Sequence, residues 1–128
     1  MPPESKTPSR SAEVVFGAGA KTADDAHALF TEVSRPNLTQ TDVDDIYKDW
    51  ATTYDKDLLL NGYNSTTPLA AARVLAEYIE DKSAPVLDLA AGTGIVGGEL
   101  KRLGFTHIDA LDASQAMLDK AVEKNVYK

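Results

Sequence analysis

Before residue 82, the apolar residues recur at the three- and four-residue spacing that is typical of amphipathic helices. The first such segment begins after Thr22, whose side chain can cap a helix, and ends before Pro36. A second begins at Thr41, where Asp44, three residues on, completes a capping-box pattern. A third covers residues 67–81. The apolar face of the first predicted helix consists of Ala26, Leu29, Phe30 and Val33. That of the second consists of Val43, Ile46, Tyr47, Trp50 and Tyr54.

The spacing changes at residue 86. Residues 86–90, VLDLA, predict a parallel strand that is buried on both faces, and residues 105–111 predict a second strand. A helix over residues 94–103 lies between them and ends at Gly104, while Ser114 caps a final helix. The inner face of that last helix is Met117, Leu118, Ala121 and Val122. The order strand, helix, strand, helix predicts an α/β fold with a parallel sheet.

The patterning divides the chain into three parts. Residues 1–21 have no hydrophobic periodicity, and we expect them to form a disordered tail because they bury too little apolar surface. Residues 22–82 form a helical N-terminal segment. Residues 83–128 carry the strand and helix units of the α/β domain.

Charge and composition narrow the class of partner. The chain has 13 basic and 20 acidic residues, a net charge of -7, which disfavours nucleic acid and anionic membrane surfaces. We therefore expect a small-molecule or protein partner. The absence of cysteine excludes disulfides and thiolate metal sites. Because residues 1–10 also lack the apolar core of a signal peptide, we expect a cytoplasmic protein.

No residue pattern predicts a metal site. The acidic run at residues 42–45 lacks the alternating ligands, the glycine and the distant glutamate of a calcium-binding EF-hand. We interpret it as the solvated face of a helix. The two histidines, His27 and His107, have no second histidine or cysteine nearby in the sequence.

The glycine-rich turn after the first strand is the best candidate for a binding site. Residues 92–97, GTGIVG, match the pattern G-x-G-x-x-G, and Asp112 follows at the end of the second strand. Such a turn brings backbone amides and a helix N-terminus close to a ligand, and the Asp112 carboxylate can accept the hydroxyl protons of a ribose. The pattern therefore predicts a nucleotide-type ligand.

Three stretches together resemble the class I S-adenosylmethionine-dependent methyltransferases. Asp88 and the loop give D-x-A-x-G-x-G, which resembles the first motif of that family, with Ala90 where many members have glycine. The residues LDAS at 111–114, followed by Met117, are similar to its second motif. Residues 47–55, YKDWATTYD, resemble the Y-D-x-W-A-x-x-Y-D stretch of small-molecule-type methyltransferases.

The resemblance implies S-adenosylmethionine as cofactor, a small-molecule methyl acceptor and the first βαβα units of a Rossmann-like fold. It implies that Asp112 holds the ribose and that Tyr54 lies near the amino-acid end of the cofactor, although Tyr54 also fits a purely structural role in the helix core. An acid at position 88 suits the ammonium group of this ligand and would repel a pyrophosphate. The loop backbone would follow the methionine moiety and two further residues would border the adenine. The residues that the resemblance places in contact with the cofactor, besides Tyr54 and Asp112, are Asp88, Ala90, Gly92, Thr93, Gly94, Ala113 and Met117.

Class I methyltransferases have a larger sheet than the two strands that this sequence predicts. We therefore expect residues 83–128 to be the first half of the methyltransferase domain, and the chain alone to be incomplete for catalysis, with no assigned catalytic residue. An NAD(P)-binding oxidoreductase fragment is an alternative that Asp88 disfavours. A second alternative is a non-enzymatic module that pairs with a partner through the unpaired sheet edges.

Overall fold

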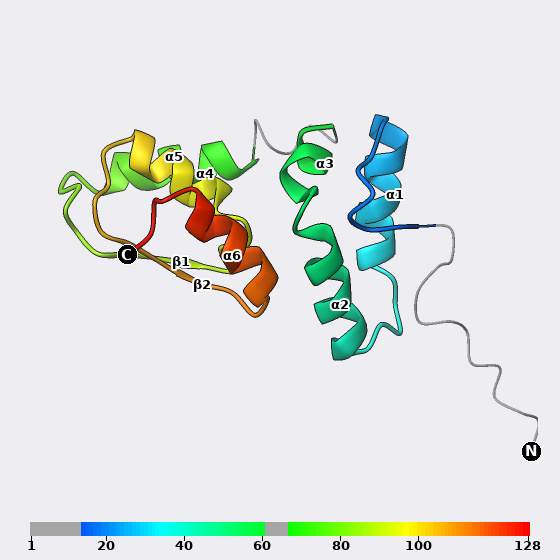
Figure 1. Ribbon diagram of the computed structural model, residues 1–128. Helices are drawn as coiled ribbons and strands as arrows, with labels where there is room; N and C mark the ends of the chain where they lie inside the picture. Colours follow the sequence, from blue (N-terminus) through cyan, green and yellow to red (C-terminus); the bar gives the residue numbers. More distant parts are fainter. Residues whose placement is uncertain (1–13, 61–66) are drawn as a thin grey trace, which may run out of the picture.

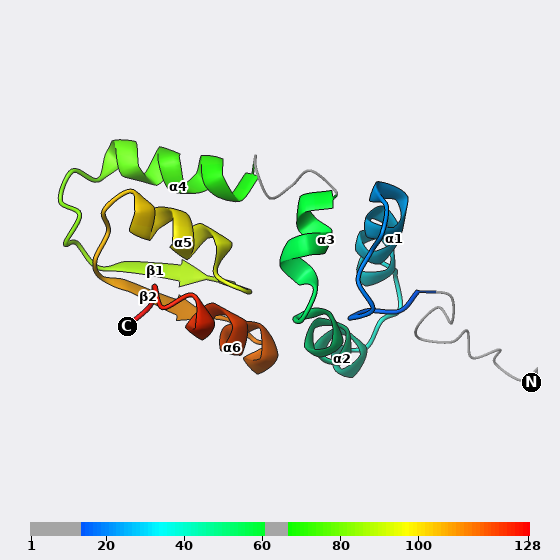
Figure 2. The same cartoon turned by 45° about the horizontal axis from the view of Figure 1, so that its top comes forward.

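The computed structural model describes residues 14–60 and 67–128, which contain both helices and strands (Figure 1). The described helices are α1 (Ala23–Val33), α2 (Gln40–Trp50), α3 (Tyr54–Leu60), α4 (Thr67–Tyr78), α5 (Ile95–Arg102) and α6 (Gln115–Glu123), and the strands are β1 (Val86–Leu89) and β2 (Ile108–Leu111). The helices α1 to α3 form a helical group, and the remaining elements form an α/β group. The strands point toward the helical group, which therefore lies at their carboxyl ends (Figure 2).

Each of the first two helices begins with a capping box. Thr22 and Asp25 exchange side-chain-to-backbone hydrogen bonds of 3.1 and 3.0 Å, which confirms the predicted start of α1. Helix α2 uses Thr39 and Asp42 in the same way, so the prediction of Thr41 as its cap is wrong by two residues. The pattern T-x-x-D occurs twice in this stretch, and the structure uses the first occurrence.

The second predicted helix is divided in two. Helix α2 ends at Trp50 and α3 begins at Tyr54, so Tyr54 does not continue the apolar face of α2 as the spacing predicted. The backbone amide of Thr53 bonds to the carbonyl oxygen of Trp50 at 3.0 Å, and its hydroxyl donates to the carboxylate of Asp57 at 2.9 Å. Such local bonds compete with the helical ladder, and hydrophobic spacing does not reveal them.

Trp50 is the centre of the core of the helical group. Its side chain is fully buried, and its ring centroid lies 5.1 Å from that of Phe16, 5.0 Å from that of Phe30 and 4.8 Å from that of Tyr54. Its indole N–H donates to the carboxylate of Asp57 at 2.8 Å. Because Asp57 is also fully buried, the polar end of the indole is satisfied inside the core.

The segment that precedes α1 packs against this core. Phe16 is only 5% exposed, and the backbone amide of Ala20 donates to the carboxylate of Asp57 at 2.8 Å. The structure therefore differs from the predicted disordered tail over residues 1–21, of which residues 1–13 lie outside the described part of the chain. A single aromatic side chain creates no periodicity, yet its burial stabilises the packed segment by about 2 kcal/mol.

In the α/β group, β1 and β2 form a parallel pair in which Val86 lies opposite Ile108. Helices α4, α5 and α6 lie on the same side of this pair (Figure 1). Gly104 has a φ of 101° just beyond α5, and Ser114 accepts a hydrogen bond from the backbone amide of Met117 at the start of α6, so both predicted helix ends are confirmed. A buried cluster of this group consists of Ala72, Leu100, Phe105 and Ile108, and Met117 and Ala121 of α6 are buried as well.

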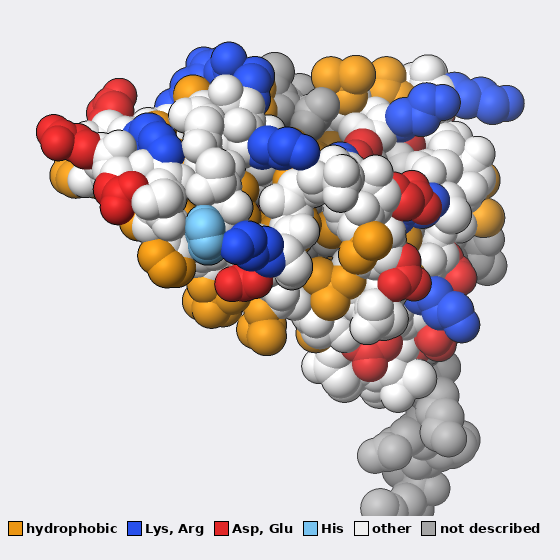
Figure 3. Space-filling model, turned by 60° about the vertical axis from the view of Figure 1, so that its left-hand side comes forward, with side chains coloured by type: hydrophobic (Ala, Val, Ile, Leu, Met, Phe, Trp, Pro, Cys, Tyr) orange, Lys and Arg blue, Asp and Glu red, His pale blue; other side chains and the backbone are white. Residues whose placement is uncertain are grey.

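The opposite face of the sheet is open within the described residues. Leu87, Leu89 and Leu111 are exposed by 58%, 65% and 59%, and Figure 3 shows hydrophobic side chains along the lower margin of this part of the molecule. The prediction that the first strand is buried on both faces is therefore wrong, as is the predicted burial of Val122. The right-handed β1–α5–β2 crossover fixes the side on which α5 lies, and α6 lies on that side too, so the alternate residues of the strands face away from the helices.

Candidate ligand-binding site

A cavity of about 280 Å³ lies at the carboxyl ends of the two strands. One wall comes from α2 and the start of α3, and the other from the glycine loop and the start of α6. The structure brings together at this cavity six of the residues predicted from the sequence: Tyr54, Ala90, Gly92, Asp112, Ala113 and Met117. The crevice beyond the carboxyl ends of parallel strands is where open α/β sheets generally bind ligands.

Five further lining residues are absent from the predicted site. They are Gln40, Val43, Asp44, Tyr47 and Ser114. The first four share one face of α2, and their spacing of three and four residues is the signal that could have indicated them. The spacing predicts core packing for Val43 and Tyr47, because periodicity alone does not distinguish a face that lines a cavity from one that is covered.

The backbone of the loop adopts the left-handed conformation at three positions. Ala90 and Gly92 both have a φ of 57°, and Gly94 has a φ of 85°. An L-residue such as Ala90 adopts this conformation at a cost, which is why glycine is favoured there. A Cβ added at Gly92 would meet no atom within 4 Å. The loop therefore offers bare backbone to the open space of the cavity.

Asp112 fixes the loop and the start of α6 at once. One of its carboxylate oxygens accepts a hydrogen bond from the backbone amide of Gly92, and the other accepts one from the backbone amide of Ser114, both at 2.8 Å. An ionised carboxylate offers about four acceptor positions. Two of these remain for hydroxyl groups of a ligand in the cavity.

Three predicted site residues do not line the cavity. Asp88 accepts a hydrogen bond from the hydroxyl of Tyr127 at 2.8 Å, and Thr93 donates its hydroxyl proton to Asp55 at 2.5 Å. Gly94 caps α5, and a Cβ there would lie 2.9 Å from the Tyr127 ring. All three therefore make contacts within the protein.

Tyr127 also explains the third glycine of the pattern. A Cβ at Gly97 would overlap the phenol of Tyr127, with the ring atom Cε1 only 2.8 Å away. Close packing inside the chain thus requires glycine at this position. The match to G-x-G-x-x-G consequently adds little support for a dinucleotide.

The cavity has a negative and aromatic lining. Among the described residues that line it, Asp44 and Asp112 are the only ionisable ones apart from the tyrosines, and none is a lysine, arginine or histidine. Burial, followed by the charge of Asp112, raises the pKa of Tyr47, while burial first and nearby charges second raise the pKa of Tyr54 to about 12. Both phenols are therefore neutral hydrogen-bond donors near pH 7. Two carboxylates without a basic partner in this lining favour a cationic ligand.

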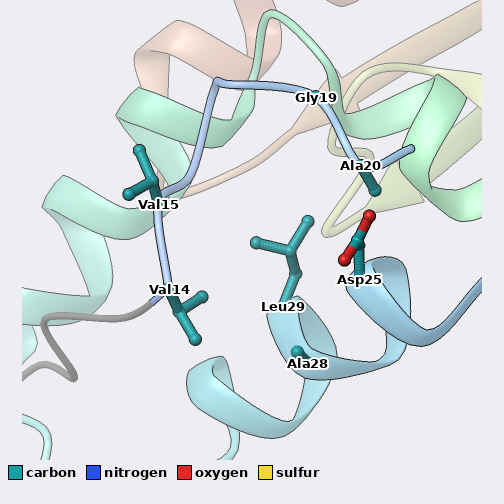
Figure 4. Close-up of a pocket in the computed structure, with 7 residues that line it drawn as sticks. All are labelled: Val14, Val15, Gly19, Ala20, Asp25, Ala28 and Leu29. Atoms are coloured by element: carbon teal, nitrogen blue, oxygen red, sulfur yellow. The ribbon is translucent and has the colours of Figure 1, made fainter. Parts of the chain in front are cut away.

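A smaller hollow of about 180 Å³ lies between α1 and the segment before it (Figure 4). Its lining is apolar except for Asp25, whose carboxylate accepts hydrogen bonds from the backbone amides of Lys21 and Thr22. These bonds lower the pKa of Asp25. Because that carboxylate already caps α1, this hollow offers a ligand little polar recognition.

Residues 14–60 and 67–128 contain neither a candidate membrane span nor a candidate metal site. None of the helices in these ranges has the length and apolar character needed to cross a membrane. The same residues contain no group of three or more histidine, aspartate and glutamate side chains arranged to hold a metal ion.

The chain is similar to a human protein named methyltransferase-like protein 27. The two are 34% identical over 84 residues, which are 64% of this chain and 34% of the human protein. The chain thus spans about a third of the length of that relative. No family model and no solved structure matches the chain. The similarity indicates a distant methyltransferase-like relationship.

Proposed function

We propose that this chain carries the S-adenosylmethionine-binding part of a class I methyltransferase with a Rossmann-like fold and a small-molecule acceptor. The observation that carries the proposal is the cavity at the carboxyl ends of β1 and β2, where Asp112 and the bare loop backbone face Tyr47 and Tyr54. The relationship to a methyltransferase-like protein supports the same class of reaction.

The residues at the cavity fit this cofactor in both shape and charge. Asp112 would hold the ribose hydroxyls through its remaining acceptor positions, and Ala113 and Met117 would border the adenine. The backbone at Ala90 and Gly92 would lie along the methionine moiety, because no side chain fills the space beside Gly92. When bound, S-adenosylmethionine supplies a methyl group that its sulfonium activates.

The charge of the cavity favours S-adenosylmethionine over NAD. A sulfonium and an ammonium group are attracted by Asp44 and Asp112, whereas a pyrophosphate would be repelled by them. The faces of Tyr47 and Tyr54 add a cation–π attraction of about 0.5–2 kcal/mol for a cation placed over a ring. These terms support the methyltransferase over the oxidoreductase alternative.

The contribution of this chain to the reaction is positioning. Methyl transfer requires the acceptor atom and the methyl group to be held in line, and the rate gain comes largely from that alignment. Asp112 would orient the ribose end of the cofactor, and neutral Tyr54 would donate a hydrogen bond near its amino-acid end. We expect turnover to need the remainder of a longer protein, because the similarity covers about a third of the relative.

Binding by the chain itself tests the proposal directly. Isothermal titration with S-adenosylmethionine, S-adenosylhomocysteine and NAD should give a measurable Kd for the first two and none for NAD. The variant Asp112→Ala should raise the Kd at least about tenfold, because it removes charge-assisted hydrogen bonds to the ribose. Asp109→Ala is the matched control, since Asp109 lies in β2, three residues before Asp112, and is exposed on the open face of the sheet.

Asp112 also stabilises the loop, so a second variant is needed. Ala113→Phe leaves both hydrogen bonds of Asp112 in place and fills the cavity instead. It should abolish binding while the midpoint of thermal unfolding stays within a few degrees of the original. Binding of NAD alone, or equal affinity in all variants, would contradict the proposed function.

A further inference from the structure

The carboxylate of Asp55 joins three parts of the molecule that are distant in the sequence. One of its oxygens accepts the hydroxyl proton of Thr93 in the glycine loop at 2.5 Å. The other accepts a hydrogen bond from Lys124, just beyond α6, at 2.7 Å. The ammonium group of Lys124 also donates to the backbone carbonyl of Thr93, which closes the cluster.

This cluster provides a polar contact between the two groups of elements. Two hydrogen bonds join the described residues 14–60 to residues 67–128 here, and both end on Asp55. Asp55 itself does not line the cavity and instead lines a separate hollow of about 360 Å³. Its neighbour Tyr54 lines the cavity, as does Gly92 beside Thr93. The cluster therefore connects the elements that form the two walls of the cavity.

The bond to Thr93 contributes more than the ion pair to Lys124. The side chains of Lys124 and Asp55 are 31% and 44% exposed, and an ion pair so open to solvent contributes little. Thr93 is only 2% exposed, so its hydroxyl needs an internal partner. A hydroxyl that donates to a carboxylate makes a short, charge-assisted bond. Loss of the acceptor leaves a buried donor unpaired.

We infer that Asp55 is a positioning residue that holds α3, and with it Tyr54, against the glycine loop. The expected effect of Asp55 on ligand affinity rests on the proposed function, whereas its role in keeping α3 against the glycine loop does not. Asp55 does not contact the cavity, so its effect on a ligand passes through Tyr54 and the loop.

The holding of α3 is measured without any ligand. Hydrogen–deuterium exchange of the α3 amides, Tyr54–Leu60, should be at least about tenfold faster in Asp55→Ala and in Thr93→Val than in the unmodified chain. Thr93→Ser keeps the hydroxyl and should match the unmodified chain, which separates the hydrogen bond from simple packing. Asp55→Asn keeps an acceptor oxygen but loses the charge, and should give an intermediate rate. Circular dichroism confirms that each variant is folded.

A double-variant cycle shows whether Asp55 and Thr93 act through one contact. If they do, Asp55→Ala combined with Thr93→Val exchanges no faster than the more affected single variant. Independent, multiplying effects would overturn the inference, as would unchanged exchange in both single variants. If Asp55→Ala unfolds the chain, Thr93→Val compared with Thr93→Ser decides the question alone.

The same variants are then titrated with S-adenosylmethionine. The Kd should rise about tenfold in Asp55→Ala and Thr93→Val and less than about twofold in Thr93→Ser. Unchanged affinity alongside faster exchange would overturn the link from α3 to the cavity. Failure of the unmodified chain to bind would instead contradict the proposed function, and the exchange rates would still decide the role of Asp55.

Discussion

The hydroxyl of Tyr127 donates a hydrogen bond to the carboxylate of Asp88 at 2.8 Å and so joins the residues after α6 to the middle of β1. Burial raises the pKa of Asp88, the bond from Tyr127 opposes this rise, and the charge of Asp112 adds to it. The folded chain therefore binds a proton at Asp88 more readily than the unfolded chain does.

This shift predicts a pH-dependent stability difference between the unmodified chain and Asp88→Asn. Because the pKa is raised on folding, the contribution of Asp88 is fully present below its unfolded pKa of about 3.9 and is lost as the pH rises through the folded value. The unmodified chain should thus gain stability relative to Asp88→Asn as the pH falls from about 7 to about 4. Urea unfolding of both proteins across this range measures the difference, and a constant difference would contradict the prediction.

Tyr127→Phe extends that test. It removes the donor that stabilises the ionised carboxylate, so the pKa of Asp88 should rise further. The pH-dependent stability difference from the matching Asp88→Asn protein should then be larger in the Tyr127→Phe background than in the unmodified chain. The double variant is the control that assigns the effect to Asp88.

Gly97 and Gly98 are neighbours in α5 with different surroundings, and they should respond oppositely to alanine. A Cβ at Gly97 overlaps the Tyr127 phenol, whereas one at Gly98 meets no atom within 4 Å. We expect Gly97→Ala to lower the free energy of unfolding by about 1–3 kcal/mol through overpacking. Gly98→Ala should raise it by about 0.5–1 kcal/mol through helix propensity. Thermal unfolding measures both, and similar stability of the two variants would refute internal packing as the reason for Gly97.

Ala90 should be more stable as glycine. Its φ of 57° costs an L-residue about 1–2 kcal/mol, while glycine adds about 0.4–1 kcal/mol of unfolded-chain entropy to the cost of folding. Ala90→Gly should therefore raise the free energy of unfolding by up to about 1 kcal/mol. Ala91 has no positive φ, so Ala91→Gly should lower it by about 0.4–1 kcal/mol. Chemical denaturation of the pair checks the sign, and a loss of stability in Ala90→Gly would show that the loop is not strained there.

The features predicted successfully from the sequence depend on neighbouring residues. A cap such as Thr22 or Ser114 acts within three residues of itself, and its hydroxyl pattern is visible in the sequence. The proximity of Gly92 and Asp112 was also predictable, because both follow parallel strands whose carboxyl ends meet.

The features that escaped prediction depend on contacts between distant segments. Thr93 is 38 residues from Asp55, and Asp88 is 39 residues from Tyr127, and neither partner belongs to a periodic pattern that would indicate the pairing. The strand sequence VLDL is compatible with a strand that helices cover on one face and with one that they cover on both. Whether a strand face is covered depends on the side of the sheet on which the following helices lie. A short apolar run does not indicate that side.

Asp57 is the polar centre of the helical group, and its removal should destabilise the chain strongly. Its fully buried carboxylate accepts three hydrogen bonds, from the indole of Trp50, the hydroxyl of Thr53 and the backbone amide of Ala20. Asp57→Ala leaves these donors without an acceptor, at about 1–3 kcal/mol for each buried group. We expect the free energy of unfolding to fall by at least about 3 kcal/mol, more than in Gly97→Ala.

Two further variants make that prediction specific. Asp57→Asn retains one acceptor oxygen and should lose less stability than Asp57→Ala. Asp45 is exposed on α2, so Asp45→Ala should change the free energy of unfolding by less than about 0.5 kcal/mol. Urea unfolding followed by the fluorescence of Trp50, the single tryptophan, reports on the helical group directly. If Asp57→Ala is tolerated as well as Asp45→Ala, the carboxylate does not hold this core together, and the packing of aromatic rings around Trp50 suffices.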